Sequence, residues 1–173
     1  ITVRSMRAAR HQIVEDMVNA LSNGLVEDVL LVGGGIRLMS DIVREVLRSL
    51  PVPQPVDNPP RRLVIYSLDP AYIAQHTLPG RLSPDEQLHR NAATAALTTA
   101  NERELTGRAR RVLEPRNVTF RFVYYQGPPL FYCYLIGRST LYWGPFTWSA
   151  EEADWAGPTN ECVRISADEH QFD

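Results

Sequence analysis

The chain has 173 residues and a formal net charge of −2 at pH 7, and 44% of its residues are hydrophobic. This length fits one domain with a substantial core, and the near-neutral charge argues against a dominant nucleic-acid-binding surface. No run of about 18 apolar residues occurs, so no membrane span is predicted. Because the chain begins with Ile1, we interpret it as a domain of a longer protein. Two cysteines are too few for a disulfide framework, which favours free buried thiols and a cytoplasmic location.

Hydrophobic periodicity in the first half of the chain alternates between helix and strand. The expected elements are a helix at 5–22, a strand at 29–32, a helix at 40–50, a strand at 62–66 and a helix at 83–113. Ser40 is the expected N-cap of the second helix, and the prolines of 51–60 predict a loop. Residues 71–82 are expected to be irregular. A capping-box sequence, Ser83-Pro84-Asp85-Glu86, starts the third helix, for which a break is expected near Gly107.

The second half of the chain contains only predicted strands. They are expected at 117–125, 130–136, 140–143 and 163–165. Gly137-Arg138-Ser139 is short enough to join the middle two strands as a hairpin. Alternating elements followed by a run of strands predict an α/β fold, in which a mixed β-sheet is flanked by helices. Gly144 follows a strand and is expected to need a positive φ or a close backbone approach.

A family resemblance rests on residues 130–165, LFYCYLIGRSTLYWGPFTWSAEEADWAGPTNECVRI. In its layout and in the order of elements over about residues 25–166, the chain resembles a phospholipase D-like domain, of the kind attached to bacterial transcription regulators. The family carries His-x-Lys-x4-Asp and then Gly-Ser-x-Asn. Laid on Gly144, this pattern places Leu130 at the histidine, Tyr132 at the lysine, Gly137 at the aspartate, Pro145 at the serine and Thr147 at the asparagine. Only Gly144, Asn160 and Glu161 keep the family's residue type.

The resemblance therefore implies a phospholipase D-like scaffold without its catalytic residues. All 18 Lys+Arg positions are arginine, so no His-x-Lys pair exists in the chain. The family's phosphoryl transfer requires a histidine nucleophile and cationic stabilisation of the phosphate oxygens. We expect no catalytic residue, no cofactor and no metal. The four histidines, which are His11, His76, His89 and His170, do not have the spacing of metal ligands.

The candidate ligand-binding residues come from three segments. Gly34 and Gly35 could cradle a phosphate with backbone N–H groups, or could simply form a tight turn between strand and helix. Tyr132 and Tyr134 could line the cleft of the family's active site, or could be half-buried strand residues. The third segment supplies Thr147, Trp148, Asn160 and Glu161. We predict that Tyr132, Thr147, Trp148 and Glu161 face one shared cavity.

A basic run near the end of the long helix has a less specific interpretation. It comprises Arg103, Arg108, Arg110, Arg111 and Arg116. We expect a solvated helix face whose charge is balanced by Glu102, Glu104 and Glu114.

We interpret the chain as a catalytically inactive sensing and dimerisation domain, the C-terminal regulatory part of a bacterial transcription regulator. Residues 1–24 are expected to be a connector helix and residues 25–173 the phospholipase D-like domain. Single-motif members of the family pair two copies, so the resemblance implies a homodimer. A small-molecule effector is a further expected partner, and DNA is contacted only through a module outside this chain. The alternatives are a divergent phosphodiesterase or nuclease with Glu161 as general base, and a purely structural domain.

Overall fold

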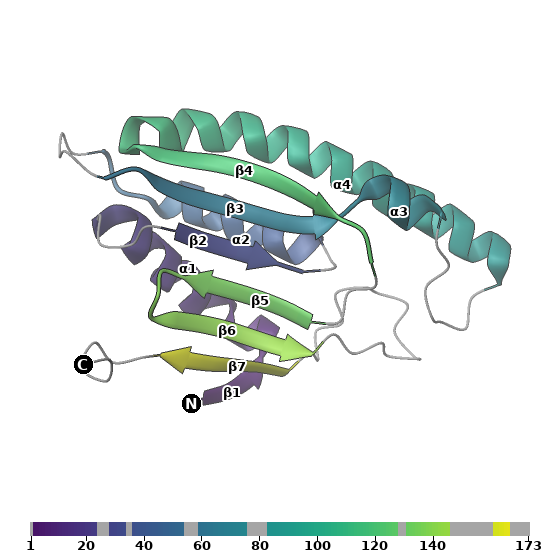
Figure 1. Cartoon of the computed structure of the whole chain (residues 1–173), viewed down its shortest axis with the longest axis horizontal. Helices are drawn as coiled ribbons and strands as arrows, with labels where there is room; N and C mark the ends of the chain where they lie inside the picture. The colour runs from purple at the N-terminus through teal and green to yellow at the C-terminus, as the bar shows by residue number, and fades with distance from the viewer. Residues whose placement is uncertain are drawn as a thin grey trace.

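The computed structural model describes residues 2–23, 28–33, 36–53, 59–75, 83–127, 131–145 and 161–166. Its elements are β1 (Thr2–Ser5), α1 (Met6–Asn23), β2 (Asp28–Val32), α2 (Ile36–Ser49), β3 (Arg61–Leu68), α3 (Pro70–Gln75), α4 (Pro84–Leu113), the 3-10 turn η1 (Glu114–Arg116), β4 (Val118–Tyr125), β5 (Phe131–Ile136), β6 (Thr140–Pro145) and β7 (Glu161–Ser166). The predicted α/β fold class is confirmed. One mixed sheet with the strand order β1-β7-β6-β5-β2-β3-β4 carries the helices (Figure 1).

The sheet has a parallel half and an antiparallel half. Strands β2, β3 and β4 are parallel neighbours, because each crossover between them contains a helix that returns the chain to the same end of the sheet. Strand β5 pairs antiparallel with β2 rather than with β4, which precedes it in the chain. Strands β6, β7 and β1 then extend the sheet in the antiparallel sense. As a result, β4 forms one edge of the sheet and β1 the other.

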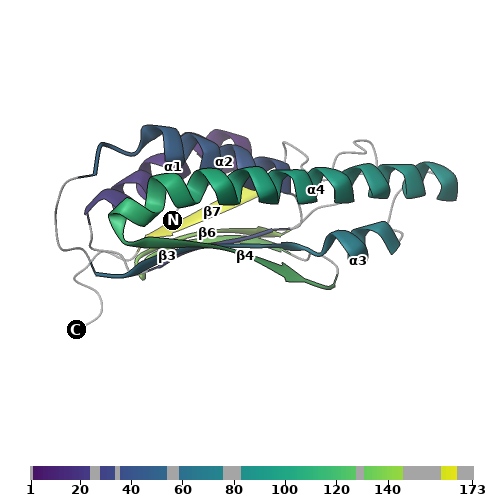
Figure 2. The ribbon, with the colours of Figure 1, turned by 90° about the horizontal axis from the view of Figure 1, so that it is seen from above.

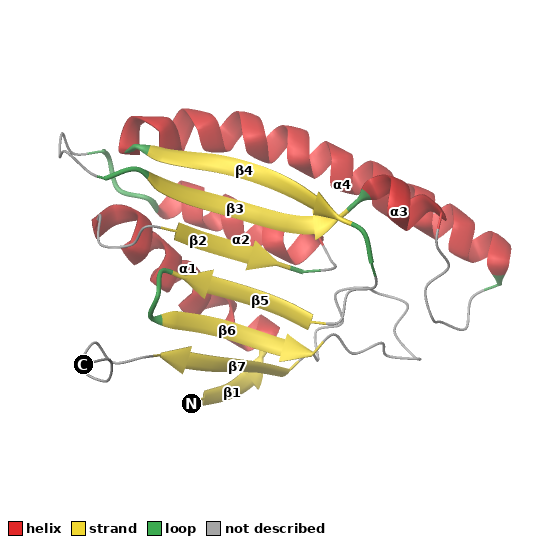
Figure 3. Cartoon of the chain, viewed as in Figure 1, coloured by secondary structure: helices red, strands yellow, loops and turns green. Residues whose placement is uncertain are grey.

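All three long helices cover the same face of the sheet. Figure 2 shows α1, α2 and α4 together on one side of the strands, and Figure 3 shows the yellow strands in front of the red helices. On the opposite face, no described helix packs against the strands. Side chains alternate along each strand, so one set faces the helices and the other set faces away from them.

Helix α1 belongs to the common core. Its predicted apolar face is buried at Ala9, Ile13, Met17, Ala20 and Leu21, in one cluster with residues of α2, α4 and the sheet. The expected connector helix is therefore packed within this fold, and the predicted division at residue 24 stays a prediction.

A polar network also ties α1 to the antiparallel half of the sheet. The Tyr142 hydroxyl donates to Asp16 Oδ2 at 2.6 Å, and Arg164 Nη2 donates to the same oxygen at 3.0 Å. Asp16 is thus held by β6 and by β7 at once.

Three predictions about local structure are wrong. Helix α2 begins at Ile36, so Ser40 is not its N-cap but a buried interior residue. Residues 70–75 form α3 rather than irregular chain, because Pro70 occupies the first helical position and Asp69 accepts a hydrogen bond from the Ala71 N–H. Helix α4 continues through Gly107 without a break. Its capping box between Ser83 and Glu86 is confirmed.

Candidate functional site

Strand β5, on which we laid the family's catalytic motif, buries alternate residues against the helices. In β5, Tyr132 and Tyr134 are only 4% and 2% exposed, and their ring centroids lie 6.3 Å apart. A Cβ at Gly33 would lie 3.4 Å from Met39 Sδ and 3.8 Å from Tyr132 Cβ, so backbone and side chains already fill this space. In place of the expected cleft, this strand contributes two core residues.

Strands β6 and β7 place buried residues next to Tyr132. Gly144 of β6 pairs with Tyr132 and lies within the strand, and it is not among the residues with positive φ. The expectation of a left-handed turn at Gly144 is therefore wrong. The register places Cys162 of β7 beside Gly144 on the helix-covered face. Burial raises the pKa of the Cys162 thiol to about 11, against an opposing hydrogen bond with Tyr132, so this thiol stays protonated and unreactive near neutral pH.

The register contradicts the predicted shared cavity. Glu161 directly precedes Cys162 in β7, and successive strand residues alternate between faces. Since Cys162 shares the face of Tyr132, Glu161 occupies a position on the opposite face, and the prediction that the two line one cavity is wrong. The other members of the predicted site, Gly34, Gly35, Thr147, Trp148 and Asn160, lie outside the described residues.

The face of the sheet opposite the helices is apolar. Two rows of paired residues cross it: Ile165, Leu141, Leu135 and Leu30 in one, and Val163, Trp143, Cys133, Val32 and Tyr66 in the other. The most exposed large side chains here are Phe131 at 44%, Trp143 at 42% and Ile165 at 42%. We call this surface the open face. Sequence reasoning missed it, although β5 and β6 carry apolar residues on both alternating sets, which is the available signal.

Charged groups lie at the rim of the open face. Arg62 Nη2 donates to Asp28 Oδ2 at 2.5 Å, and this hydrogen bond lowers the pKa of the Asp28 carboxyl. Arg121 of β4 lies at the free edge of the sheet, next to Val64, at the end of the first row. An apolar centre with a charged rim is the usual composition of a protein interface.

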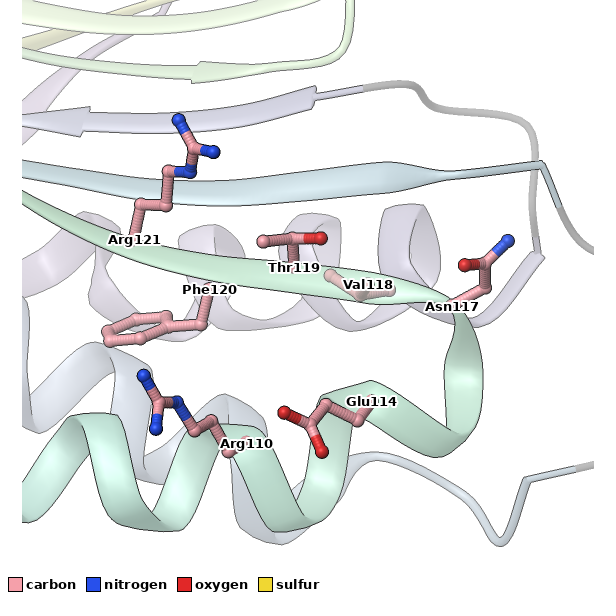
Figure 4. Close-up of a pocket in the computed structure, with 7 residues that line it drawn as sticks. All are labelled: Arg110, Glu114, Asn117, Val118, Thr119, Phe120 and Arg121. Carbon is pink, nitrogen blue, oxygen red and sulfur yellow. The ribbon is translucent and has the colours of Figure 1, made fainter.

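A second feature lies at the free edge of β4. A groove with a volume of about 470 Å³ runs between the last turns of α4 and the start of this strand (Figure 4). It is lined by Arg110, Glu114, Asn117, Val118, Thr119, Phe120 and Arg121. Figure 4 shows the Arg110 side chain reaching from α4 toward the Phe120 ring.

The basic run of α4 is balanced only in part by its predicted partners, since Arg108 interacts electrostatically with Glu104. Two of its expected partners bond elsewhere: Glu104 accepts from Arg44 Nε at 3.2 Å, and Glu102 accepts from the Tyr124 hydroxyl. Hydrogen bonding by Arg44 lowers the pKa of Glu104. The side chains of Arg110 and Arg121 make no hydrogen bond or ion pair within the described part of the chain. The groove at the β4 edge therefore carries two guanidinium groups that no described carboxylate binds, beside the single carboxylate of Glu114.

The two cysteines, Cys133 and Cys162, are both free. Within the described ranges, no three His, Cys, Asp or Glu residues are grouped as they would be to hold a metal ion, and no helix has the length and apolar character needed to cross a membrane. A scan against protein-family models and searches of curated proteins and of solved structures give no match for this chain.

Proposed function

We propose that the chain is a non-catalytic dimerisation domain whose open face binds a second copy of the chain. The observation that carries this proposal is the apolar centre of that face, where Phe131, Trp143 and Ile165 remain more than two-fifths exposed. Contiguous exposed apolar surface on a soluble domain marks an interaction site, since leaving it in water costs free energy.

The size of the open face suits a dimer contact. Seven strands are spaced about 4.8 Å apart, and each is about five residues long at about 3.3 Å per residue. The sheet therefore covers roughly 500 Å² in flat projection. Side-chain relief enlarges the accessible area beyond this value. Stable interfaces bury about 800 Å² per partner, which is of the same order.

The chemistry of the face also suits a second copy. A two-fold contact places the same patch on both sides, so the patch must be compatible with itself. From β7 to β3 the two central rows contain no charged residue, and Arg121 of β4 lies at the end of the first row. The nearby Asp28 and Arg62 neutralise each other. Sheet-on-sheet packing of two such faces resembles the interior of a β-sandwich.

The absence of catalysis in the proposal rests on β5. The family resemblance places catalytic residues on this strand, yet Tyr132 is 4% exposed and lies beside Gly33 in the core. A degenerate phospholipase D-like domain that retains only its dimerisation role is consistent with this packing. A cytoplasmic regulatory domain of a bacterial transcription regulator needs to dimerise and needs no catalytic activity. We include this regulatory role in the proposal.

Sedimentation equilibrium tests the proposal. The wild-type chain is expected to dimerise at tens of micromolar or below, and Trp143→Glu is expected to be monomeric, because the new carboxylate would be buried without a partner. Val52→Glu is the matched control, since Val52 is an 84% exposed apolar residue after α2, away from the sheet. A monomeric wild type, or a Trp143→Glu dimer as strong as wild type, would contradict the proposal.

An activity assay tests the non-catalytic part separately. The purified chain is incubated with a panel of phosphodiesters, with and without divalent metal ions, and no turnover is expected. Turnover that disappears in Glu161→Gln would favour the divergent phosphodiesterase with this glutamate as general base.

A further inference from the structure

We propose that the free edge of β4 and the groove beside it bind an extended acidic peptide segment as an additional strand of the sheet. This site adjoins the open face only at Arg121, and its partner is a different molecule from the second copy of the chain. The proposal does not depend on dimerisation. It rests on the backbone of β4, on the groove and on the charge of two arginines.

The backbone of β4 is available for strand addition. The Arg61 N–H donates to Asn117 O and the Asp69 N–H donates to Tyr125 O, so odd-numbered carbonyls at both ends of β4 face β3. In a parallel ladder the intervening residues point their N–H and C=O groups the other way. Val118, Phe120, Phe122 and Tyr124 therefore present these groups at the free edge, where no other described strand pairs with them. A row of such groups is a template for an added strand.

The groove provides the space and the apolar contact that such a strand needs. Its volume of about 470 Å³ lies within the range of about 300–1,000 Å³ that is typical of ligand sites. On the helix-covered side of β4, Phe120, Phe122 and Tyr124 form an aromatic row, with ring centroids 6.4 Å and 5.6 Å apart. Apolar side chains on one face of an added strand would pack beside this row.

The charge of the groove selects an acidic segment. Other arginines are occupied: Arg44 is bonded to Glu104, Arg62 to Asp28 and Arg164 to Asp16. In contrast, Arg110 and Arg121 are exposed, and neither is paired with a carboxylate among the described residues. Arg110 lies with Phe120 on the helix-covered side of β4, and Arg121 lies on the opposite side of the strand (Figure 4). Glu114 is the single acidic residue of the lining. Carboxylates of a partner would form charge-assisted hydrogen bonds with both guanidinium groups.

The same arginine disfavours pairing of β4 with a second copy of itself. Arg121 lies near the middle of β4, so antiparallel pairing of two β4 strands would bring the two Arg121 side chains opposite or diagonal to each other, about 5–8 Å apart. Like charges at that separation are destabilising in a sheet. The edge thus repels its own copy and attracts an acidic strand.

Fluorescence anisotropy with a designed peptide tests the proposal. The probe is a capped, labelled peptide of sequence Glu-Glu-Val-Val-Glu-Glu, which spans about 20 Å when extended and presents carboxylates and a valine on each of its two faces. We expect it to bind the whole chain, and we expect Arg110→Glu and Arg121→Glu each to weaken binding about tenfold or more. Arg103→Glu, an exposed arginine on α4 outside the groove, is the matched control and should bind as wild type does. Melting curves confirm that each variant is folded, and Arg121→Gln is the alternative if Arg121→Glu is not.

Three further arms identify the binding mode. The same peptide with Lys in place of each Glu is expected to show no binding, and the acidic peptide with alternate backbone nitrogens methylated is expected to lose its binding. Amide hydrogen exchange is expected to slow at Phe120 and Phe122 when the acidic peptide is added. Trp143→Glu should bind the peptide as wild type does, which separates this site from the dimer contact.

Several results would overturn the proposal. These are an absence of binding, binding that survives backbone methylation, equal binding of the basic peptide, and exchange protection outside β4. Displacement by inorganic pyrophosphate or by a short single-stranded DNA, without a requirement for backbone donors, would instead assign the groove to a phosphate-bearing ligand and would contradict the peptide proposal.

Discussion

Substitution of Arg61 by methionine is expected to destabilise the fold strongly. Arg61 is the first residue of β3 and is 1% exposed. Its Nη1 donates to Leu21 O at 2.7 Å and its Nη2 donates to Arg116 O at 2.9 Å. One side chain therefore joins the end of α1, the start of β3 and the turn before β4. Burial lowers the pKa of this guanidinium, with the nearby Arg116 charge as a smaller cause.

The size of the effect follows from these contacts. Two hydrogen bonds from a charged donor contribute about 1.5–3 kcal/mol each. Part of this is offset, because Arg61→Met also removes a buried cation that has no carboxylate partner among the described residues. Methionine has a similar shape, so the cavity left behind is small. We expect Arg61→Met to lower the free energy of unfolding by about 2–3 kcal/mol, and Arg61→Lys to cost less, because an ammonium group is expected to keep one of the two carbonyl contacts.

Urea unfolding followed by tryptophan fluorescence measures this loss. All variants are compared at one protein concentration, because dimerisation makes the apparent stability concentration-dependent. The midpoint should fall while the slope against urea stays unchanged, as expected for a native-state effect. Ordinary surface substitutions change the free energy of unfolding by about 0.5 kcal/mol or less. A change of this size for Arg61→Met would show that the buried hydrogen bonds of Arg61 do not stabilise the fold as expected.

Three other predictions concern single side chains. Tyr142→Phe removes one donor to the Asp16 carboxylate and should cost about 1–2 kcal/mol in urea unfolding; an unchanged midpoint would contradict it. Gly144→Val should cost about 1–3 kcal/mol through overpacking of a buried strand position, measured as a lower melting temperature; Gly144→Ala should cost less. The lowered pKa of Glu104 means that its pair with Arg44 stabilises the fold above about pH 4.5 and loses this effect as pH falls through the folded-state pKa. Arg44→Gln should therefore reduce stability by at most about 1 kcal/mol at pH 7 and by less at about pH 3.

Local sequence signals predicted most of the individual elements. The spacing of Ile13, Met17 and Leu21 gave the buried face of α1, and Ser83 with Glu86 gave the start of α4, because both signals depend on residues within one or two turns. Ser40 misled for the same reason. Its N-cap signal is local, whereas the helix already begins at Ile36 and Ser40 is buried in its interior, among residues that are distant in sequence.

The site could not be predicted in the same way, because it depends on which face the helices cover. Alternation correctly placed Tyr132 and Tyr134 on one face of β5, but that face could have been either the core or a cleft. Glu161 shows how sensitive such an inference is. An offset of a single residue from Cys162 moves a strand position to the other side of the sheet, and only the register reveals it.

The groove at the β4 edge depends on strand order. Strands β4 and β5 are consecutive in the sequence, yet β5 pairs with β2 at the centre of the sheet and leaves β4 at its edge. Consecutive strands are often neighbours, so the sequence alone favours the wrong pairing. The open face has the same origin, since sequence periodicity does not reveal that α1, α2 and α4 all lie on one side.

Hydroxyl-radical footprinting across a dilution series tests dimerisation through the open face, because it reports where the two copies touch. Side chains of the open face, measured at Phe131, Trp143 and Ile165, should react slowly at concentrations where the chain is dimeric and faster as dilution yields monomers. Leu88 on α4, which is 59% exposed, should react equally at every concentration. A dimer in which the three open-face residues remain as reactive as in the monomer would contradict the account.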